Sequence, residues 1–275
     1  MTDQPTVSLN NGVPIPQLGF GVFKVPPAET AEIVGRALAA GYRHIDTAAM
    51  YGNEAGVGRA VAESGIPRDE LFVTTKLNND AHGTDEALRA FEDSRRKLGL
   101  DVVDLYLIHW PLPSQNRYVE TWRALEKLRD DGVVRAIGVS NFQSAHLQRL
   151  LDETDTVPAL NQIELHPYLT QEALRRFDAD HGIATEAWSP LARGGTLLRD
   201  QVVTSTAEKY GRTPAQIVLR WHLQLGNVVI PKSATPSRIE ENFAVFDFEL
   251  ADDDVAAISG LNRDERTGPD PDAFG

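Results

Sequence analysis

Short apolar runs alternate with longer amphipathic segments along most of the chain. Eight runs typical of buried strands occupy residues 18–21, 44–46, 72–75, 103–109, 136–139, 160–164, 184–188 and 228–230. Between most of them, apolar residues recur at three- and four-residue spacing, for example in residues 30–40 and 84–98, which favours helices. Two short stretches, residues 6–9 and 13–15, precede this series. They flank Asn11-Gly12, a pair typical of a hairpin turn.

The alternation of strands and helices predicts an α/β fold. Strands separated by helices pair in parallel, and eight parallel strands are the number that closes a (β/α)8 TIM barrel. Two helix starts carry a capping-box pattern, one from Thr213 to Gln216 and the other from Ser237 to Glu240. No linker or low-complexity segment precedes the tail at residues 263–275, which is rich in Gly, Pro and Asp. We therefore expect one domain over residues 1–275, with an N-terminal β-hairpin.

Composition excludes several classes of protein. The chain of 275 residues has a formal net charge of −13, which argues against nucleic acid as a partner because such a surface repels a phosphate backbone. The absence of cysteine excludes disulfides and thiolate chemistry. The N-terminus has no signal-peptide core, and no segment reaches the roughly 20 apolar residues of a membrane helix. These features predict a soluble, cytoplasmic protein.

Polar residues gather at the ends of the apolar runs. Catalytic groups of a TIM barrel lie at the C-terminal ends of its strands. In this chain those positions hold Asp46, Lys76, His109, Ser140-Asn141, Gln162-Ile163-Glu164, Trp188-Ser189 and Lys232-Ser233. Several of these groups are ionisable, although the runs before them are apolar. Solvation alone does not explain such a set, so we expect a functional site at this end of the barrel.

Residues 41–58 hold the first candidate pair. Asp46 ends a short strand, at a position where its side chain is expected to point out of the core towards solvent. Tyr51 follows in a loop flanked by glycine, and a helix is expected to begin near Glu54. A carboxylate and a phenol this close together suggest proton-handling chemistry. The structural alternative is an ion pair between Asp46 and Arg43.

The motifs of the chain resemble those of the aldo-keto reductase family over nearly its whole length. The matching segments are GYRHIDTAAMYGNE, VTTKL, DLYLIHWP, AIGVSNF, NQIELHP, VIPKSA and ENFAVFDF, in the family's order and spacing. The resemblance is greatest to the bacterial branch typified by 2,5-diketo-D-gluconate reductases. It implies a (β/α)8 barrel with a C-terminal loop over the barrel mouth. It also implies that Asp46, Tyr51, Lys76 and His109 form the catalytic tetrad.

The chemistry of these four residues fits that implied role. Carbonyl reduction needs a hydride at carbon and a proton at oxygen, and a free phenol with a pKa of about 10 is a weak donor near neutral pH. We expect the Lys76 ammonium to lower the pKa of Tyr51, and Asp46 to keep Lys76 charged. His109, as a neutral imidazole, is expected to donate to the carbonyl oxygen. Taken alone, a His at a strand end is more often a satisfied core residue.

The hydride requires a cofactor, because no side chain carries one. The usual dinucleotide fingerprint is missing: Gly19-Phe20-Gly21 and Gly56-Val57-Gly58 both lack the third glycine. The resemblance implies that Ser140, Asn141 and Gln162 hold the nicotinamide carboxamide, while Trp188 stacks on the ring. Ser189 and Leu191 would follow the pyrophosphate. The further cofactor contacts it implies are Gly21, Val22, Phe23 and Ile230.

A local basic cluster predicts NADPH rather than NADH. Lys232 and Ser233 end the last strand, and Arg238 lies in the first turn of the next helix. Cations, a hydroxyl group and helix N-terminal amides together form an anion site. This cluster matches the family's pocket for the 2′-phosphate, and the resemblance places Glu241 and Asn242 at the adenine.

The predicted substrate is a small carbonyl compound. Phe23, Met50, Tyr51, Asn78, His109 and Trp110 are expected to line its pocket, with the C-terminal tail as a variable flap. Asn78 stands where the family type used for comparison has tryptophan, which puts a sugar-acid substrate in doubt. Aldehydes, ketones and small dicarbonyls, including 2,5-diketo-D-gluconate, remain candidates. A monomer is the common state in the family.

Two other functions stay open at this point. One is a catalytically silent, NADPH-binding regulatory barrel, which the complete tetrad argues against. The other is a metal-dependent barrel hydrolase that uses His44, Asp46, His109 and His166. The first strand has no His-x-His pair, and Lys76 and Lys232 would repel a cation. No metal is therefore predicted.

Overall fold

The eight predicted strand runs form one parallel sheet that closes into a barrel. In the computed structural model, which describes residues 4–274, the sheet order is β10-β9-β8-β7-β6-β5-β4-β3. A parallel bridge between Leu18 and Val229 joins the two outer strands and closes the barrel. The strands are β3 Phe20–Gly21, β4 His44–Asp46, β5 Phe72–Leu77, β6 Val103–Ile108, β7 Val134–Ser140, β8 Leu160–Glu164, β9 Ala184–Trp188 and β10 Val228–Val229. The TIM-barrel prediction is confirmed. Residues 1–3 and 275 of the expected single domain lie outside the described part of the chain.

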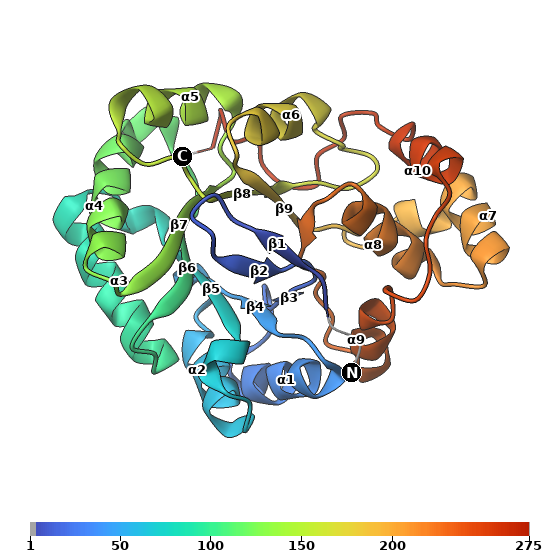
Figure 1. The fold of residues 1–275 in the computed structure, drawn as a ribbon, viewed down its shortest axis with the longest axis horizontal. Helices are drawn as coiled ribbons and strands as arrows, with labels where there is room; N and C mark the ends of the chain where they lie inside the picture. Colours follow the sequence, from blue (N-terminus) through green and yellow to red (C-terminus); the bar gives the residue numbers. More distant parts are fainter. Residues whose placement is uncertain (1–3, 275) are drawn as a thin grey trace.

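Helices surround the barrel on its outer face (Figure 1). They are α1 Pro27–Ala40, α2 Glu54–Glu63, α3 Thr84–Leu98, α4 Tyr118–Asp130, α5 Ser144–Glu153, α6 Glu172–Asp180, α7 Gln201–Tyr210, α8 Pro214–Gln224, α9 Pro236–Phe243 and α10 Asp252–Ser259. Single 3₁₀ turns occur at Ala49–Tyr51, Arg68–Glu70, Asn79–Ala81, Pro113–Gln115 and Leu197–Arg199. The main apolar core lies between helices and barrel, where residues such as Phe91, Tyr106 and Trp122 are buried.

One of the two predicted capping boxes forms. The Thr213 side chain accepts from the backbone N–H of Gln216, and the Gln216 side chain accepts from the N–H of Thr213. The box predicted at Ser237 is wrong. Ser237 was the expected N-cap, but it lies inside α9, which begins at Pro236. Proline is favoured at a first helical position because it lacks the N–H group that would be unsatisfied there. Its N-cap is Thr235, whose side chain makes no capping hydrogen bond.

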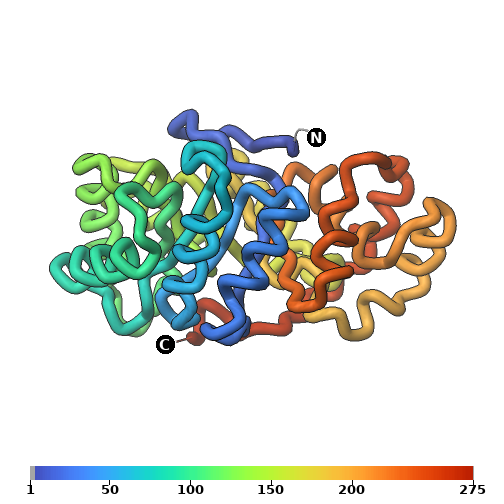
Figure 2. The backbone as a smooth tube through the Cα atoms, turned by 90° about the horizontal axis from the view of Figure 1, so that it is seen from below, coloured from blue at the N-terminus to red at the C-terminus, as the bar shows by residue number. Residues whose placement is uncertain are grey.

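The two ends of the barrel are covered by opposite ends of the chain. β1 (Thr6–Ser8) and β2 (Pro14–Pro16) pair as the predicted antiparallel hairpin and close one end. Leu9 and Ile15 pack there with barrel residues such as Leu105. Figure 2 shows the hairpin on one side of the molecule and the C-terminal tail on the other. The tail therefore covers the end of the barrel at which the C-terminal ends of the strands lie.

Among the described residues, no helix combines the length and apolar character needed to cross a membrane.

Candidate active site

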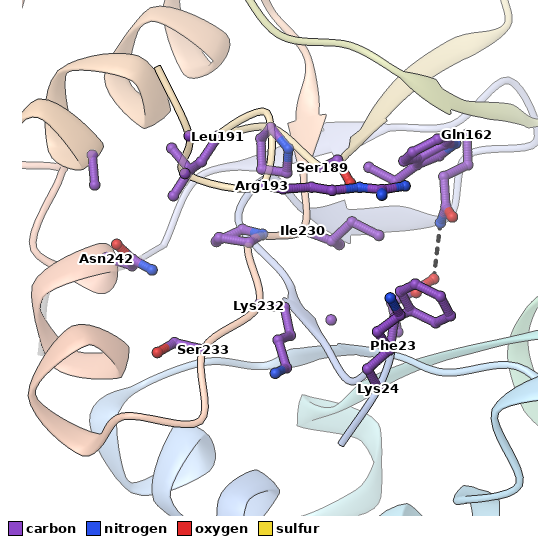
Figure 3. Close-up of a pocket in the computed structure, with 18 of the residues that line it drawn as sticks. Phe23, Lys24, Gln162, Ser189, Leu191, Arg193, Ile230, Lys232, Ser233 and Asn242 are labelled. Atoms are coloured by element: carbon purple, nitrogen blue, oxygen red, sulfur yellow. Dashed lines mark hydrogen bonds between the residues drawn. The ribbon is translucent and has the colours of Figure 1, made fainter. Parts of the chain in front are cut away.

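A cavity of about 1030 Å³ opens at the C-terminal ends of the barrel strands. Figure 3 shows side chains from several strand ends and loops around it. Most residues predicted from the sequence line it: Gly21, Phe23, Asp46, Met50, Tyr51, His109, Trp110, Ser140, Asn141, Gln162, Trp188, Ser189, Leu191, Ile230, Lys232, Ser233, Arg238, Glu241 and Asn242. The strand-end positions and the residues that the family resemblance implied therefore lie around one cavity.

Three predicted residues do not line the cavity. Lys76 is fully buried below it. Val22 is also fully buried, and its carbonyl oxygen accepts from Asn53 Nδ2 at 3.0 Å. Asn78 lies at the start of a 3₁₀ turn, where its side chain accepts from the backbone N–H of Asn79 at 2.9 Å. The structure therefore gives Asn78 a turn-capping contact and no place in the cavity wall.

Other lining residues were not predicted. Lys24, Arg193 and Arg199 line the cavity, together with Phe274 of the C-terminal tail that was expected to act as a flap. Arg193 belongs to a loop in which Ser189, Ala192 and Arg193 all have left-handed φ angles, of 48°, 48° and 57°. Non-glycine residues in this conformation store strain, and they cluster at ligand clamps. The available sequence signal was the Arg193-Gly194-Gly195 stretch directly after a strand end.

Asp46 and Lys76 form an ion pair inside the barrel. Lys76 Nζ donates to Asp46 Oδ1 at 2.7 Å, to Asp46 Oδ2 at 2.8 Å and to the Thr47 carbonyl at 2.9 Å. All three ammonium protons are therefore used. Burial alone would lower the pKa of Lys76, but Asp46 raises it above its ordinary value.

Asp46 points to this partner and not to solvent. Its exposed fraction is 2%, so the predicted solvent-facing orientation is wrong. Burial raises the pKa of Asp46, while Lys76 and Gln162 lower it. Arg43 donates to the carbonyls of Leu38 and Tyr42, so the structural Arg43–Asp46 pair does not form. Asp46 instead keeps Lys76 positively charged beneath the cavity.

Tyr51 lies directly above this pair. Its ring centroid is 5.1 Å from Lys76 Nζ and 5.7 Å from the centroid of the His109 ring. Gly52, with a φ of 67°, ends the 3₁₀ turn that presents Tyr51, in a conformation that glycine adopts without strain. Burial raises the pKa of Tyr51, and Lys76 opposes that shift. The expected lowering by Lys76 is present, but burial outweighs it, so the pKa of Tyr51 is raised.

His109 is neutral. Burial, followed by the charge of Lys76, holds its pKa well below the ordinary value. Its Nδ1 atom is buried and has no hydrogen-bond partner within residues 4–274. Because an unprotonated Nδ1 is the better fit to an apolar surrounding, the single proton of the neutral ring is assigned to Nε2.

A hydrogen-bonded group of polar side chains forms the cavity wall beside this triad of Tyr51, Lys76 and His109. Trp188 Nε1 donates to Asn141 Oδ1 at 2.8 Å, which fixes the indole ring at the end of β9. Asn141 Nδ2 donates to the carbonyl of His109 at 2.9 Å and to Ser140 Oγ at 3.1 Å. The amide protons of Asn141 are therefore used within the protein, and its oxygen retains one lone pair for a ligand.

Gln162 connects two acidic groups of the barrel interior. Its Nε2 atom donates to Asp46 Oδ2 and to Glu186 Oε2, both at 2.8 Å. Glu186 was not predicted from the sequence. Burial and the nearby Asp46 raise the pKa of Glu186 to about 8. Its signal in the sequence is an ionisable residue in the middle of a predicted strand, at Ala184–Trp188.

The far end of the cavity is cationic. Lys232 and Arg238 are exposed, and Ser233 Oγ accepts from the backbone N–H of Thr235 at 3.1 Å, just before α9. Together with Lys24, Arg193 and Arg199, these cations form no ion pair with any described residue. Figure 3 shows Lys232 and Ser233 on the same side of the cavity as Asn242. This end can accept an anionic group.

The C-terminal tail is fastened across the cavity mouth by Glu164. This buried carboxylate accepts from the backbone N–H of Thr267 at 2.6 Å, from its hydroxyl group at 2.5 Å and from the N–H of Gly268 at 3.0 Å. A Cβ atom at Gly268 would lie 2.5 Å from the Trp188 ring, so only glycine fits this approach. Further on, the Phe274 ring packs 4.4 Å from that of Trp110. The tail therefore forms part of the cavity wall.

The described residues contain no cluster of three or more His, Asp or Glu side chains that could hold a metal ion. His44 bonds Thr74 at 3.0 Å and His166 bonds Glu164 at 3.1 Å, so neither points to a shared centre with Asp46 and His109. These contacts remove the support for the hydrolase alternative.

Comparison with known proteins gives similarity over the whole length. The model of the Aldo/keto reductase family matches residues 17–263. The chain is 57% identical to an aldo-keto reductase of Mycobacterium sp. (strain JLS), over 98% of both chains. It is 51% identical to methylglyoxal reductase DkgA of Escherichia coli (strain K12), over 100% of both. A crystal structure of a Gox0644 mutant in complex with NADPH is 51% identical and superposes with a TM-score of 0.95 over 99% of each chain.

Proposed function

The chain belongs to the aldo/keto reductase family, and we propose that it reduces aldehydes and ketones to alcohols with NADPH. The observation that carries this proposal is the buried Lys76–Asp46 ion pair beneath Tyr51, at the wall of a cavity of about 1030 Å³. A general acid tuned by a buried ammonium serves proton transfer to a carbonyl oxygen.

The cavity fits NADPH in both size and chemistry. When bound, this cofactor supplies the hydride that no side chain can carry. Trp188 offers a ring face, and Gln162 and Asn141 offer oxygen acceptors for the carboxamide of the nicotinamide. Two of the cations without an ion pair among the described residues, Lys232 and Arg238, lie just before α9 and in its first turn. The Gox0644 mutant, a relative of this chain, was solved in complex with NADPH, which agrees with this arrangement.

Lys232, Ser233 and Arg238 would hold the 2′-phosphate that distinguishes NADPH from NADH. Ser233 supplies a hydroxyl group, and α9 begins next to it without a side-chain capping hydrogen bond from Thr235. Glu241 and Asn242 line the same end and would contact the adenine. Glu241 Oε1 is held by Thr213 Oγ1 at 2.9 Å, so its orientation is fixed before a ligand arrives.

Tyr51 would donate the proton. Burial raises its pKa, so the phenol is protonated at neutral pH and available as an acid. When the proton moves from Tyr51 to the carbonyl oxygen, a phenolate forms. The Lys76 ammonium stabilises that charge, and Asp46 keeps Lys76 protonated. His109 would donate from Nε2 to the same carbonyl oxygen and so fix its position.

The substrate wall suits a small carbonyl compound. Phe23 and Met50, which are 50% and 43% exposed, line the cavity together with the packed rings of Trp110 and Phe274. We infer that the substrates include small dicarbonyls. The Escherichia coli relative is named a methylglyoxal reductase, which makes methylglyoxal the first compound to assay, with 2,5-diketo-D-gluconate beside it. The monomeric state and the cytoplasmic location stay predictions.

The test is NADPH oxidation by the purified protein with a panel of aldehydes, ketones and dicarbonyls. We expect turnover of at least one dicarbonyl and a loss of about 10³-fold in Tyr51→Phe, in line with the contribution of a general acid. Tyr106→Phe is the matched control, because the buried Tyr106 hydroxyl has no partner in the described structure. A Tyr51→Phe enzyme that keeps full activity would refute the proton-donor role. A protein that binds NADPH and reduces no carbonyl compound would instead be the silent regulatory barrel.

A further inference from the structure

Glu186 is a buried acidic residue that the proposed mechanism does not use. It lies in β9 with an exposed fraction of 0%, and its Cα atom pairs in the sheet register with that of Gln162 in β8. Glu186 Oε2 accepts from Gln162 Nε2 at 2.8 Å. Oε1 has no hydrogen-bond partner among residues 4–274, and the Nε2 atom of His44, whose pKa burial lowers to about 3, lies 3.8 Å away. Contact with water cannot explain an acidic residue at this buried position, so its contacts within the protein must.

The hydrogen bonds of Gln162 supply that explanation. A primary amide has two N–H donors, and those of Gln162 go to Asp46 and Glu186. The amide oxygen, Oε1, is therefore left as an acceptor, and Gln162 lines the cavity (Figure 3). A rotated amide would place its oxygen against the carboxylate of Asp46, which is unfavourable. Asp46 thus fixes which face of the amide the cavity receives, and Glu186 accepts its second N–H.

The two acidic residues differ in charge. Asp46 is paired with Lys76, whereas burial and the neighbouring Asp46 raise the pKa of Glu186 to about 8. At neutral pH Glu186 is therefore a neutral carboxylic acid. It accepts the Gln162 N–H without adding a second negative charge beside Asp46 or Tyr51. Its contribution is an oxygen atom at a fixed place, which a glutamine can also provide.

We propose that Glu186 is a positioning residue, which holds the Gln162 amide so that Oε1 accepts an N–H from the carboxamide of the nicotinamide. This inference rests on the proposed function, in which NADPH occupies the cavity with its nicotinamide against Trp188. Without the Glu186 contact, one N–H of Gln162 is free and only Asp46 restrains the amide. Loss of the Glu186 hydrogen bond is therefore expected to weaken the contact between Gln162 and the carboxamide and to leave the other cofactor contacts unchanged.

The test compares two cofactors in matched variants. Dissociation constants are measured for NADPH and for its reduced 3-acetylpyridine analogue, in which a methyl group replaces the carboxamide NH₂. Glu186→Met keeps the volume and removes the acceptor, while Glu186→Gln keeps an acceptor. We expect Glu186→Met to bind NADPH about tenfold more weakly, the value of one hydrogen bond, with less than a twofold change for the analogue. Glu186→Gln is expected to restore NADPH binding.

Each other result overturns the inference. Equal weakening of both cofactors in Glu186→Met would mean a general structural role, and unchanged binding of both would mean no role. A Glu186→Gln protein as weak as Glu186→Met would mean that charge, not an acceptor, is required. Thr185→Val is the control for β9, because Thr185 bonds Asp178 on the outer side of the barrel at 3.0 Å. If Glu186→Met does not fold, Glu186→Ser, which is too short to reach Gln162, replaces it under the same criteria.

The same data separate this inference from the proposed function. If the wild-type protein binds NADPH and the analogue equally, the carboxamide contact itself is absent and the proposed cofactor position fails. If the wild-type protein prefers NADPH and Glu186→Met keeps the full preference, only the positioning role of Glu186 fails.

Discussion

The two ends of the cavity are built in opposite ways. At the catalytic end, defined by Asp46, Tyr51, Lys76, His109 and Gln162, the charged and amide groups are buried and already paired with one another. At the phosphate end, defined by Lys232, Ser233 and Arg238, the cations are exposed and form no ion pair within the described residues. The geometry is therefore fixed at the end that we propose for catalysis, and positive charge is unpaired at the end that we propose for the 2′-phosphate of the cofactor.

This contrast stands out against the rest of the surface. In a chain with a net charge of −13, most lysines and arginines away from the cavity lie within 4 Å of a carboxylate. Unpaired cations are therefore concentrated at the cavity. A pre-paired site needs little reorganisation during reaction, whereas an unpaired cation gives its full interaction to an incoming anion.

The largest expected effect comes from breaking the pairing at the catalytic end. Lys76→Met removes the ammonium that stabilises the Tyr51 phenolate and leaves Asp46 buried without its counter-ion. We expect kcat/KM for a dicarbonyl to fall by about 10³-fold, with a change in the Kd of NADPH of less than about fivefold. Steady-state kinetics and a binding titration measure the two quantities.

The double variant Asp46→Asn/Lys76→Met separates catalysis from folding. It removes both charges, so no unpaired buried ion remains and the thermal stability lost in Lys76→Met is expected to return in part. Activity is expected to stay low. Activity that returned with stability would show that the ion pair only supports the fold.

The next prediction concerns how the buried Glu186 makes the free energy of unfolding depend on pH. Glu186 has an ordinary pKa of 4.5 in the unfolded chain and a pKa of about 8 in the folded protein. Between these values the folded state binds more protons, so this residue's contribution to stability is complete below about pH 4.5 and is lost as the pH rises through 8. Relative to Glu186→Gln, the wild-type protein should lose on the order of a few kcal/mol of unfolding free energy between pH 5 and pH 8.5.

Urea unfolding at several pH values measures this difference. Asp178 is a second buried acid, because burial raises its pKa to about 7. Asp178→Asn therefore serves as a second comparison with the wild-type protein. The difference in unfolding free energy between the wild-type protein and Asp178→Asn should begin to change in the same acidic range. It should become constant about one pH unit lower than the difference for Glu186→Gln. Parallel wild-type and Glu186→Gln curves would mean that Glu186 is ionised in the folded protein at neutral pH.

The sequence predicted the barrel because strand runs and amphipathic helices have distinct periods. Residues 160–164 and 184–188 were predicted with the bounds of β8 and β9. It placed Asp46, His109 and Gln162 at one cavity because strand ends of a barrel share one face, whereas the family resemblance supplied residues of the loops and helices such as Tyr51 and Asn242. The Ser237 capping box failed because Pro236 starts α9 one residue earlier. Asn78 failed as a wall residue because its side chain caps its own turn.

Contacts between distant segments were beyond the sequence pattern. In the sequence, Glu186 is an acidic residue in the middle of a predicted strand, and only the sheet register places it beside Gln162. Phe274 reaches Trp110 because Glu164 fastens the tail about 100 positions away in the chain, at Thr267 and Gly268. The net pKa of Tyr51 depends on how far burial outweighs the charge of Lys76, which a list of neighbours does not give.

The smallest predicted effect lies at the phosphate end. Arg238→Ala removes one exposed, unpaired cation, so the fold and the catalytic end are expected to stay intact. We expect the Kd of NADPH to rise by about 10- to 100-fold, the value of a charge-assisted hydrogen bond, while the Kd of NADH changes less than twofold because NADH lacks the 2′-phosphate. Arg176→Ala is the control, since it changes the net charge equally at an exposed residue of α6. Fluorescence titrations with both cofactors measure the constants. If NADPH and NADH weakened equally, Arg238 would not bind the 2′-phosphate, and the unpaired cations at this end would need another ligand.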